Sequence, residues 1–292
     1  MNLIADMSNL CWIMRFGLLK DKTKRDPLAK EVIMQYTLTN IIDVYKKYNC
    51  NNLILAFDCK GNNWRKSLYE GYKANRDTDY DMYYEEVHTA INELKSIFST
   101  TTNAYCVEVD KCEADDVVAC VSVLSKDPSV IYSTDKDFCQ LVSEKVKVFN
   151  PLKKEERTSD NKEFDLFEKC IRGDKGDNIL SAYPRVRKTK LLKAFEDKYE
   201  MANLMNERLK DGTLVKDNYE FNRDLIDFDR MPVWVVNSVM NRIVELQDDL
   251  DKNPKYDYIK CLRAFRDSNL KNVALNIVPN TVFMFKNFKK IL

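Results

Sequence analysis

Histidine is nearly absent from this chain, since His88 is the one histidine among 292 residues. A zinc centre built from several histidines is therefore excluded, and a serine nucleophile activated by histidine and aspartate is disfavoured. The nine cysteines are an odd number and include no C-x-x-C pair. They favour free thiols in a reducing compartment over a disulfide framework or a zinc site. We expect His88 to border the buried face of its helix.

Long apolar runs are also missing. No run approaches the ~20 residues that a membrane-spanning helix needs, so we expect no membrane partner. The first residues, Met1–Asp6, predict a short strand and not a signal peptide. With no internal repeat or low-complexity segment, the composition is that of an ordinary soluble protein with one large or two smaller domains.

Acids follow three apolar runs. Asp6, Asp58 and Asp135 each close a run of the kind that forms a buried parallel strand. Functional groups collect at the carboxyl ends of such strands, so we expect these carboxylates to lie together. They repel one another by ~1 kcal/mol per close pair in water and by several-fold more near a protein surface. Hard oxygen ligands under such repulsion predict a magnesium or manganese site.

Six further acids belong to the same group: Glu113, Asp115, Asp116, Asp137, Asp174 and Asp177. Helix capping is the alternative for Asp115 and Asp116, although three acids within four residues exceed what a cap needs. Setting all nine aside leaves 37 acidic residues against 47 basic ones. An acidic pocket in a basic body suits a polyanion substrate held next to metal, and evenly mixed surface charge is the alternative.

Strand and helix patterns alternate up to about residue 163, and beyond it the pattern is helical. This order predicts an α/β domain over 1–163, with a mostly parallel central sheet flanked by helices, and a helical domain over 164–292. The charged stretch 153–162 is predicted to be a solvated loop at the boundary. Strands are predicted near 3–6, 53–58, 105–109, 130–135 and 146–149, and helices near 28–48, 84–98 and 111–124.

Five motifs in order resemble the acidic motifs of the 5′-nuclease, or flap endonuclease, family: Asp6–Asn9, Phe57–Asp58, Glu113–Asp116, Thr134–Asp137 and Gly173–Asn178. One such motif carries no weight alone, whereas five in order do. The segment 64–76 is similar to the family's basic segment at the base of its arch. The stretch 222–229 looks like the phage ribonuclease H subgroup. The resemblance implies a PIN-like core, an arch at about 61–84 and a helix–turn–helix-like, duplex-binding element at about 171–198.

The resemblance also implies the metal chemistry. Two or more Mg²⁺ ions, with Mn²⁺ as a substitute, would be bound by the nine acids. Asp6, Asp58, Glu113, Asp115, Asp116 and Asp135 would serve the first ion, and Asp137, Asp174 and Asp177 would complete a second with Asp135 near both. The reaction would be phosphodiester hydrolysis by a metal-activated water, giving 5′-phosphates.

The implied role is a 5′→3′ exonuclease and 5′-flap endonuclease with ribonuclease H activity. It would act on RNA–DNA hybrids and on branched or 5′-ended DNA, removing RNA primers and flaps during phage DNA replication in the cytoplasm of the infected host cell. A catalytically inactive, structure-specific DNA-binding protein of the same fold is the alternative. An aspartyl phosphatase is disfavoured, because such enzymes want a second Asp two residues after the first, where this chain has Ser8.

Basic residues are implied to hold the nucleic acid. Lys73 and Arg76 would reach the scissile phosphate and join Asp135 as catalytic groups, while Tyr72 would stack on a base. The other implied nucleic-acid-binding residues are Arg65, Lys66, Arg185, Arg187, Lys188 and Lys190. The family's usual glycines are replaced in the turn Ser181–Arg187.

Two further features are predicted for the helical domain, a helix cap and a packed aromatic stretch. Thr189 is predicted to cap a helix whose N-terminus is a phosphate site. The aromatic stretch Val282–Phe288 is predicted to pack on its own domain. Docking of this stretch to a single-strand binding protein or a sliding clamp is the alternative.

Overall fold

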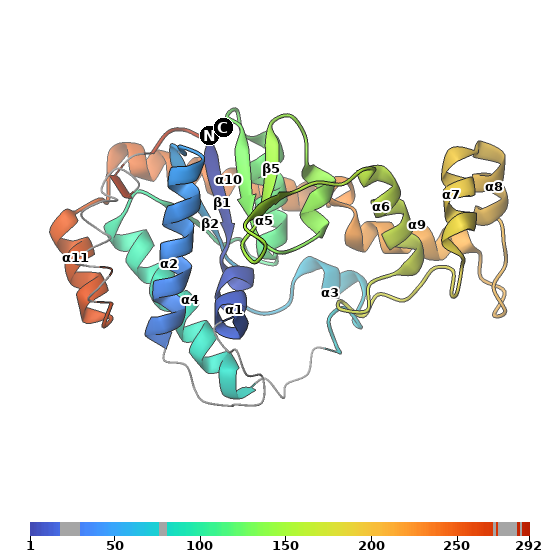
Figure 1. The fold of residues 1–292 in the computed structure, drawn as a ribbon, viewed down its shortest axis with the longest axis horizontal. Helices are drawn as coiled ribbons and strands as arrows, with labels where there is room; N and C mark the ends of the chain where they lie inside the picture. Colours follow the sequence, from blue (N-terminus) through green and yellow to red (C-terminus); the bar gives the residue numbers. More distant parts are fainter. Residues whose placement is uncertain (18–29, 76–80, 271–272, 274–284, 287) are drawn as a thin grey trace. The chain divides into compact units, whose positions relative to one another are not determined.

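The computed structural model describes residues 1–17, 30–75, 81–270, 273, 285–286 and 288–292 (Figure 1). The chain forms two compact units. The first unit comprises Met1–Gly61, Asp79–Arg157 and Val233–Leu292, and the second comprises Asn62–Thr78 and Thr158–Pro232.

A six-stranded sheet forms the centre of the first unit, in the order β3-β2-β1-β4-β5-β6. The strands are β1 (Asn2–Asp6), β2 (Asn52–Ala56), β3 (Tyr105–Val107), β4 (Ser129–Tyr132), β5 (Val146–Asn150) and β6 (Glu155–Arg157). All neighbours are parallel except β5 and β6. Every residue of β1 to β4 is buried, as strands covered on both faces require.

Helices cover both faces of this sheet. One layer contains α1 (Met7–Gly17), α2 (Lys30–Lys47), α4 (Asp81–Thr101) and α11 (Tyr258–Asp267), and α2 and α4 lie side by side in Figure 1. The other contains α5 (Ala114–Leu124), which packs on β1, and α10 (Val233–Lys252), which packs on α5 and β3. The predicted mostly parallel sheet flanked by helices is therefore confirmed.

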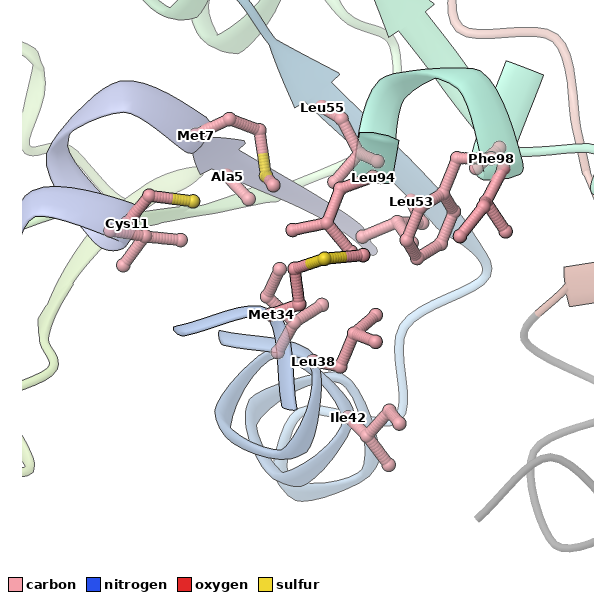
Figure 2. Close-up of a cluster of buried hydrophobic side chains, with 14 of the residues drawn as sticks. Ala5, Met7, Cys11, Met34, Leu38, Ile42, Leu53, Leu55, Leu94 and Phe98 are labelled. Carbon is pink, nitrogen blue, oxygen red and sulfur yellow. The ribbon is translucent and has the colours of Figure 1, made fainter. Parts of the chain in front are cut away.

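The core between the sheet and α2 and α4 is apolar throughout (Figure 2). Leu53 and Leu55 point to this face because alternate strand residues share a face. Met34 and Leu38 from α2 and Phe98 from α4 meet them, all fully buried. Each such side chain contributes about 1.5–3 kcal/mol through burial, which fixes the strands that carry the acids.

Strand order places the acids at one edge. β1 lies between β2 and β4: the chain passes from β1 to β2 and β3 on one side and then crosses back to β4 on the other side of β1. In sheets of this kind the crevice for a ligand opens at the carboxyl ends of the strands, where the order reverses. Asp6 ends β1, while Asp58 and Asp135 follow the ends of β2 and β4.

The second unit is helical in its described residues. It contains α3 (Trp64–Leu68), α6 (Lys162–Arg172), α7 (Lys188–Glu196), α8 (Lys198–Met205), α9 (Val215–Ile226) and the short 3₁₀ turn η3 (Phe228–Arg230). Phe164 and Phe167 of α6 pack with Leu191 and Leu204 in its larger core. A smaller cluster joins Tyr72 to Cys170, Ile179, Leu225 and Ile226.

The predicted division into domains over 1–163 and 164–292 is corrected in two respects. Asn62–Thr78, predicted to lie inside the α/β domain, belongs to the second unit. The chain enters its long second-unit segment at Thr158, close to the predicted boundary, but Val233–Leu292 returns to the first unit. The amide of Lys126 donates to the Ile291 carbonyl at 3.1 Å, and the Tyr105 hydroxyl donates to the Lys289 carbonyl at 2.8 Å. Helical periodicity reveals that a face is buried, but not which surface covers it.

The aromatic stretch packs on its own unit where it is described. Phe285 is fully buried, and its ring lies 5.6 Å from that of Phe98 and 6.1 Å from that of Phe265, centroid to centroid. The predicted packing is thus confirmed for Phe285, while Val282–Met284 lie outside the described residues.

Other local differences are small. The predicted loop 153–162 contains β6, a polar three-residue edge strand too short to show a pattern. The predicted arch, 61–84, begins with α3 and ends inside α4, and residues 76–80 lie outside the described ones. All nine cysteines are free thiols, as predicted. Among described residues, no helix has the length and apolar character that a membrane crossing requires.

Candidate active site

Asp6 lies at the carboxyl edge of the sheet, where the charges of Asp58 and Asp135 act on it. Asp6 is buried, accepting hydrogen bonds from the Asn9 amide at 3.1 Å and the Ser133 hydroxyl at 3.2 Å. Burial first, and then the negative charges of Asp58 and Asp135, raise the pKa of Asp6 to about 7 against these hydrogen bonds. The predicted gathering of Asp6, Asp58 and Asp135 is therefore present.

Hydrogen bonds, one of them to the distant Asn9, hold the loop after β4 in place. Asp135 accepts a hydrogen bond from the Asp137 amide at 2.8 Å, which opens the 3₁₀ turn η2 (Asp137–Leu141). The Asp135 amide donates to the Ser133 hydroxyl at 3.1 Å, and the Thr134 amide donates to the Asn9 side chain at 2.9 Å. Asn9 and Ser133 were not predicted as site residues, although both stand inside or beside the acidic motifs.

The start of α5 brings in the next acids. The Ala114 amide donates to Asp58 at 2.9 Å, joining α5 to the end of β2. Glu113 caps the helix, and its amide donates to Asp116 at 2.9 Å within a capping box. Asp116 is fully buried, so capping, the alternative interpretation, is confirmed for this residue. Asp115, in the same first turn, is half-buried.

These donors fit a hard divalent cation. Asp6, Asp58 and Asp135 offer only carboxylate oxygens, the ligands that magnesium and manganese prefer. Burial, and after it the charges of Asp58 and Asp135, raise the pKa of Asp6, and a bound cation would offset both effects. In the part of the chain that the structure describes, no three acidic, histidine or cysteine side chains already converge in an arrangement that holds an ion. The carboxylates are oriented by their own hydrogen bonds.

His88 lies on α4 beside this edge. Its ring centroid is 3.8 Å from that of Tyr84, one helical turn earlier. Burial lowers the pKa of His88, with the charge of Asp58 acting in the opposite direction. His88 is half-buried, which confirms that it borders the buried face of its helix.

A tight turn in the second unit carries Asp174 and Asp177. One oxygen of Asp174 accepts the Gly176 amide at 2.7 Å, and the other lies 2.7 Å from the ammonium of Lys169. Burial of Asp174 raises its pKa, but Lys169 and the turn amides outweigh burial, so the pKa lies below its ordinary value. The charged form of Asp174 is thus favoured by the ammonium of Lys169 and by the turn amides.

Gly173 is required by this turn. Its φ of 71° and ψ of −173° fall in a region that only glycine occupies readily, and a Cβ there would stand 2.3 Å from the Ile179 carbonyl oxygen. We expect Gly173→Ala to destabilise the second unit by about 1–3 kcal/mol, measured by thermal unfolding. Gly212→Ala, with a φ of 88° but no atom within 4 Å of the added Cβ, is the matched control for strain alone. Equal losses in the two variants would contradict a specific clash at Gly173.

Lys73 is joined to the same turn. Its amide donates to the Asp177 carbonyl at 2.9 Å, and the Tyr72 hydroxyl donates to the Asp177 carboxylate at 3.3 Å. The Lys73 ammonium lies 4.9 Å from the centroid of the Tyr72 ring, and the residue is half-buried. The structure therefore brings Lys73 and Asp177 together, while Arg76 lies outside the described residues.

Two predicted nucleic-acid contacts are corrected. Tyr72 is only 3% exposed, with its ring in an apolar cluster, so it cannot stack on a base there. Arg65 is 4% exposed, donates to the Leu225 carbonyl at 2.9 Å and stacks on Trp64. Both side chains satisfy their polar ends internally, which lets the remainder pack in the core. Lys66, by contrast, is exposed.

The other predicted basic residues are all exposed. Lys188 and Lys190 pair with Glu168 and Glu207, whereas Arg185 and Arg187 form no ion pair with any residue in the described ranges. Arg185 has a φ of 62°, the left-handed conformation that favours glycine.

Helix α7 begins one residue before the predicted cap. Its cap is Arg187 and its first residue is Lys188, so the prediction that Thr189 is the cap is wrong. The Arg187 side chain makes no cap hydrogen bond of the kind that a threonine hydroxyl would give. The helix nevertheless starts between exposed cations, and the phosphate site at its N-terminus stays a prediction.

Comparison with known proteins adds a consistent result. The family described as "5′-3′ exonuclease, N-terminal resolvase-like domain" matches residues 3–170. Ribonuclease H of Enterobacteria phage T4 is 30% identical over 227 residues, which cover 67% of this chain and 70% of that protein. A 5′-3′ exonuclease of Mycoplasmopsis pulmonis is 25% identical over 250 residues, which cover 77% of this chain and 82% of that protein.

Solved structures share the fold. The T5 D15 protein co-crystallised with metal ions aligns with a TM-score of 0.64 and 20% identity, covering 84% of this chain and 98% of that one. The bacteriophage T5 D15 flap endonuclease, in a pseudo-enzyme–product complex with DNA and metal ions, aligns with a TM-score of 0.58 and 20% identity. That alignment covers 92% of this chain and 99% of the T5 chain. At this identity the likeness confirms the predicted α/β core.

Proposed function

Because this chain belongs to the 5′-3′ exonuclease family, we propose that it is a magnesium-dependent 5′→3′ exonuclease and 5′-flap endonuclease with ribonuclease H activity. The observation that carries this proposal is the placement of buried Asp6 at the carboxyl edge of the sheet, with Asp58 and Asp135 near enough for their charges to raise its pKa. The charges of Asp58 and Asp135 disfavour a charged Asp6 in the metal-free fold, whereas a cation site requires carboxylates in this arrangement.

Eight of the nine acids are proposed to bind the ions. Asp6, Asp58, Glu113, Asp115 and Asp135 would serve one ion, with buried Asp116 acting by holding Glu113. Asp137, Asp174 and Asp177 would serve a second. When bound, such ions supply an activated water for in-line attack on phosphorus and stabilise the leaving oxygen. Mn²⁺ is expected to substitute for Mg²⁺, because both accept hard oxygen ligands.

Lys73 is proposed to contact the scissile phosphate. Its ammonium group would stabilise the negative charge that develops on the phosphate oxygens in the transition state. The backbone link between Lys73 and Asp177 supports this role, since it ties the cation to a proposed ligand. Arg76 is proposed for the same contact from motif similarity alone.

The proposed substrates are RNA–DNA hybrids and branched or 5′-ended DNA. The name of the T4 relative, ribonuclease H, and the DNA bound to the T5 flap endonuclease support this substrate class. Removal of RNA primers and flaps during phage DNA replication, in the cytoplasm of an infected host cell, is the proposed setting.

Arg185 and Arg187 are proposed to bind the duplex backbone. Both are exposed and carry no ion pair among the described residues, so their charges are available to phosphates. We expect the Arg187→Ala variant to weaken binding to all duplexes alike and to reduce the slope of log K against log[salt] by about 1. Binding measured by anisotropy across salt concentrations checks this. Arg263→Ala, at an exposed arginine of the first unit, is the control, and an unchanged slope for Arg187→Ala would contradict the contact.

Product mapping tests the whole proposal. End-labelled flap, nick and RNA–DNA hybrid substrates are incubated with Mg²⁺, with Mn²⁺ or with a chelator. Release of 5′-phosphate products with either ion, and none with the chelator, is the expected result. Tight junction binding without cleavage would instead support an inactive, structure-specific DNA-binding protein, the runner-up from the same fold.

A further inference from the structure

The turn that carries Asp174 and Asp177 is closed at its base. The Asp174 amide donates to the Ile179 carbonyl at 2.9 Å, and the Ile179 amide donates back to the Asp174 carbonyl at 2.7 Å. This pair of hydrogen bonds forms one antiparallel bridge and sets the turn apart as a compact loop.

Asn222 of α9 holds both ends of this loop from outside. It is 3% exposed, and its side-chain nitrogen donates at 2.8 Å to the carbonyl of Cys170 and at 2.8 Å to that of Leu180. Cys170 precedes the turn and Leu180 follows it, so one buried amide joins its two stems. The loop therefore cannot move without breaking buried hydrogen bonds, each of which contributes about 1 kcal/mol.

A second segment, Gly71–Asn75, is fastened to the tip of the loop. Besides the Tyr72 hydroxyl, three hydrogen bonds join them: Lys73 N to Asp177 O at 2.9 Å, Asn178 Nδ2 to Gly71 O at 2.8 Å and Asn75 Nδ2 to Lys175 O at 2.7 Å. The segment and the loop thus form one module, which contains a proposed phosphate contact and two proposed metal ligands.

Asn178 joins the loop to the segment Gly71–Asn75 through its side chain. Its φ of 58° lies in the left-handed region, which asparagine tolerates better than other residues with a side chain. That conformation, next to Asp177, lets its amide reach the Gly71 carbonyl. The Asn178 side chain is half-buried, and Asn178 is neither one of the nine acids nor one of the proposed nucleic-acid-binding residues.

We propose that Asn178 is a positioning residue that fixes the Lys73 ammonium relative to the Asp177 carboxylate. The contact to the substrate phosphate and the binding of the second ion are thereby coupled through one hydrogen-bonded module. This inference rests on the proposed function, since it assigns work to Lys73 and Asp177 in that reaction.

Asn178→Gly tests the coupling, because glycine keeps the positive φ and removes only the amide. We expect kcat to fall roughly 10- to 100-fold with KM nearly unchanged, as for a misplaced catalytic group. In a Lys73→Met background the same substitution is expected to lower kcat by less than about 3-fold, since no ammonium remains to be positioned. Equal fold losses in both backgrounds would overturn the proposal.

Metal binding gives a readout independent of turnover. Titration calorimetry with Mn²⁺ alone, without nucleic acid, is expected to show binding that is about 10-fold weaker in Asn178→Gly, as for other groups that orient a ligand. Unchanged Mn²⁺ binding would also overturn the proposal. If the wild-type protein binds Mn²⁺ but does not cleave, the proposed function fails while this titration still decides the role of Asn178.

Two further variants separate positioning from folding. Asn269→Gly changes another asparagine with a positive φ, of 60°, which is exposed at the end of α11. It should leave kcat and Mn²⁺ binding unchanged. Asn75→Ala removes the neighbouring clamp to the Lys175 carbonyl from an exposed position. Asn75→Ala should lower kcat and weaken Mn²⁺ binding in the same way as Asn178→Gly, but by smaller factors. This variant still tests the module if Asn178→Gly does not fold. Wild-type kcat and Mn²⁺ binding in Asn75→Ala would count against the module.

Discussion

Replacing Asp135 or Asp137 by asparagine is expected to lower magnesium-dependent cleavage by roughly 10³-fold or more and to leave junction binding largely intact. The amide oxygen of an asparagine can still accept the hydrogen bond that the Asp137 amide donates to position 135, now at 2.8 Å. The loop should therefore keep its shape while losing the negative charge that a cation needs. Single-turnover cleavage of an end-labelled 5′ flap measures the loss.

Binding must be measured on the same variants. Anisotropy of a labelled flap junction, in Ca²⁺ to suppress turnover, should give affinities within about 3-fold of the wild type, because the proposed contacts to duplex phosphates are made by other residues. Asp43→Asn, at an exposed position of α2, removes one negative charge from the same unit and should cleave normally. Full turnover by both Asp135→Asn and Asp137→Asn would falsify the two-ion assignment.

Asp6→Asn is expected to abolish cleavage and, at the same time, to stabilise the metal-free protein at pH 8. The pKa of Asp6 is raised in the folded state to about 7, from an ordinary 3.8. Between these values the folded chain binds more protons than the unfolded chain, so its stability falls as pH rises. Above pH 7 the charged carboxylate opposes folding by a few kcal/mol, at about 1.4 kcal/mol per pKa unit. The neutral amide removes that penalty.

Thermal unfolding in a chelator, at pH 4 and pH 8, measures this effect. The gain in stability from Asp6→Asn should be large at pH 8 and nearly absent at pH 4, where the native carboxylate is protonated. Added Mg²⁺ should stabilise the wild type at pH 8 and have little effect on the variant, since ligand binding to the folded state raises stability. A variant less stable than the wild type at pH 8 would show that burial and the neighbouring carboxylates do not disfavour the charged form of Asp6.

Strands and acids were predictable because each leaves a local mark. A strand covered on both faces is a short apolar run, and Asp6, Asp58 and Asp135 stand directly after such runs. Their approach in space follows from strand parallelism, which the lack of short hairpin connections indicates. For these residues, the order of the chain is enough to predict the neighbourhood.

Burial of amphipathic side chains was not predictable in the same way. Arg65 and Tyr72 occur in a basic, aromatic stretch that resembles an exposed nucleic-acid contact, yet each finds an internal hydrogen-bond acceptor. Those acceptors, the Leu225 carbonyl and the Asp177 carboxylate, lie more than 100 residues away in sequence. Asn222 was missed for the same reason, because a buried amide and an exposed one look alike in sequence.

The return of Val233–Leu292 to the first unit has a consequence for biosynthesis. All residues of the second unit have been synthesised once Pro232 is added, before α10 and α11 are synthesised. Domains that are completely synthesised fold as units while translation continues, at about 5–20 residues per second. The second unit can thus finish folding first, although the first unit contains the N-terminus. Until α10 is synthesised, α5 and β3 lack the helix that packs against them in the finished first unit. The sheet that carries Asp6, Asp58 and Asp135 is therefore the last part of the chain to gain its full packing.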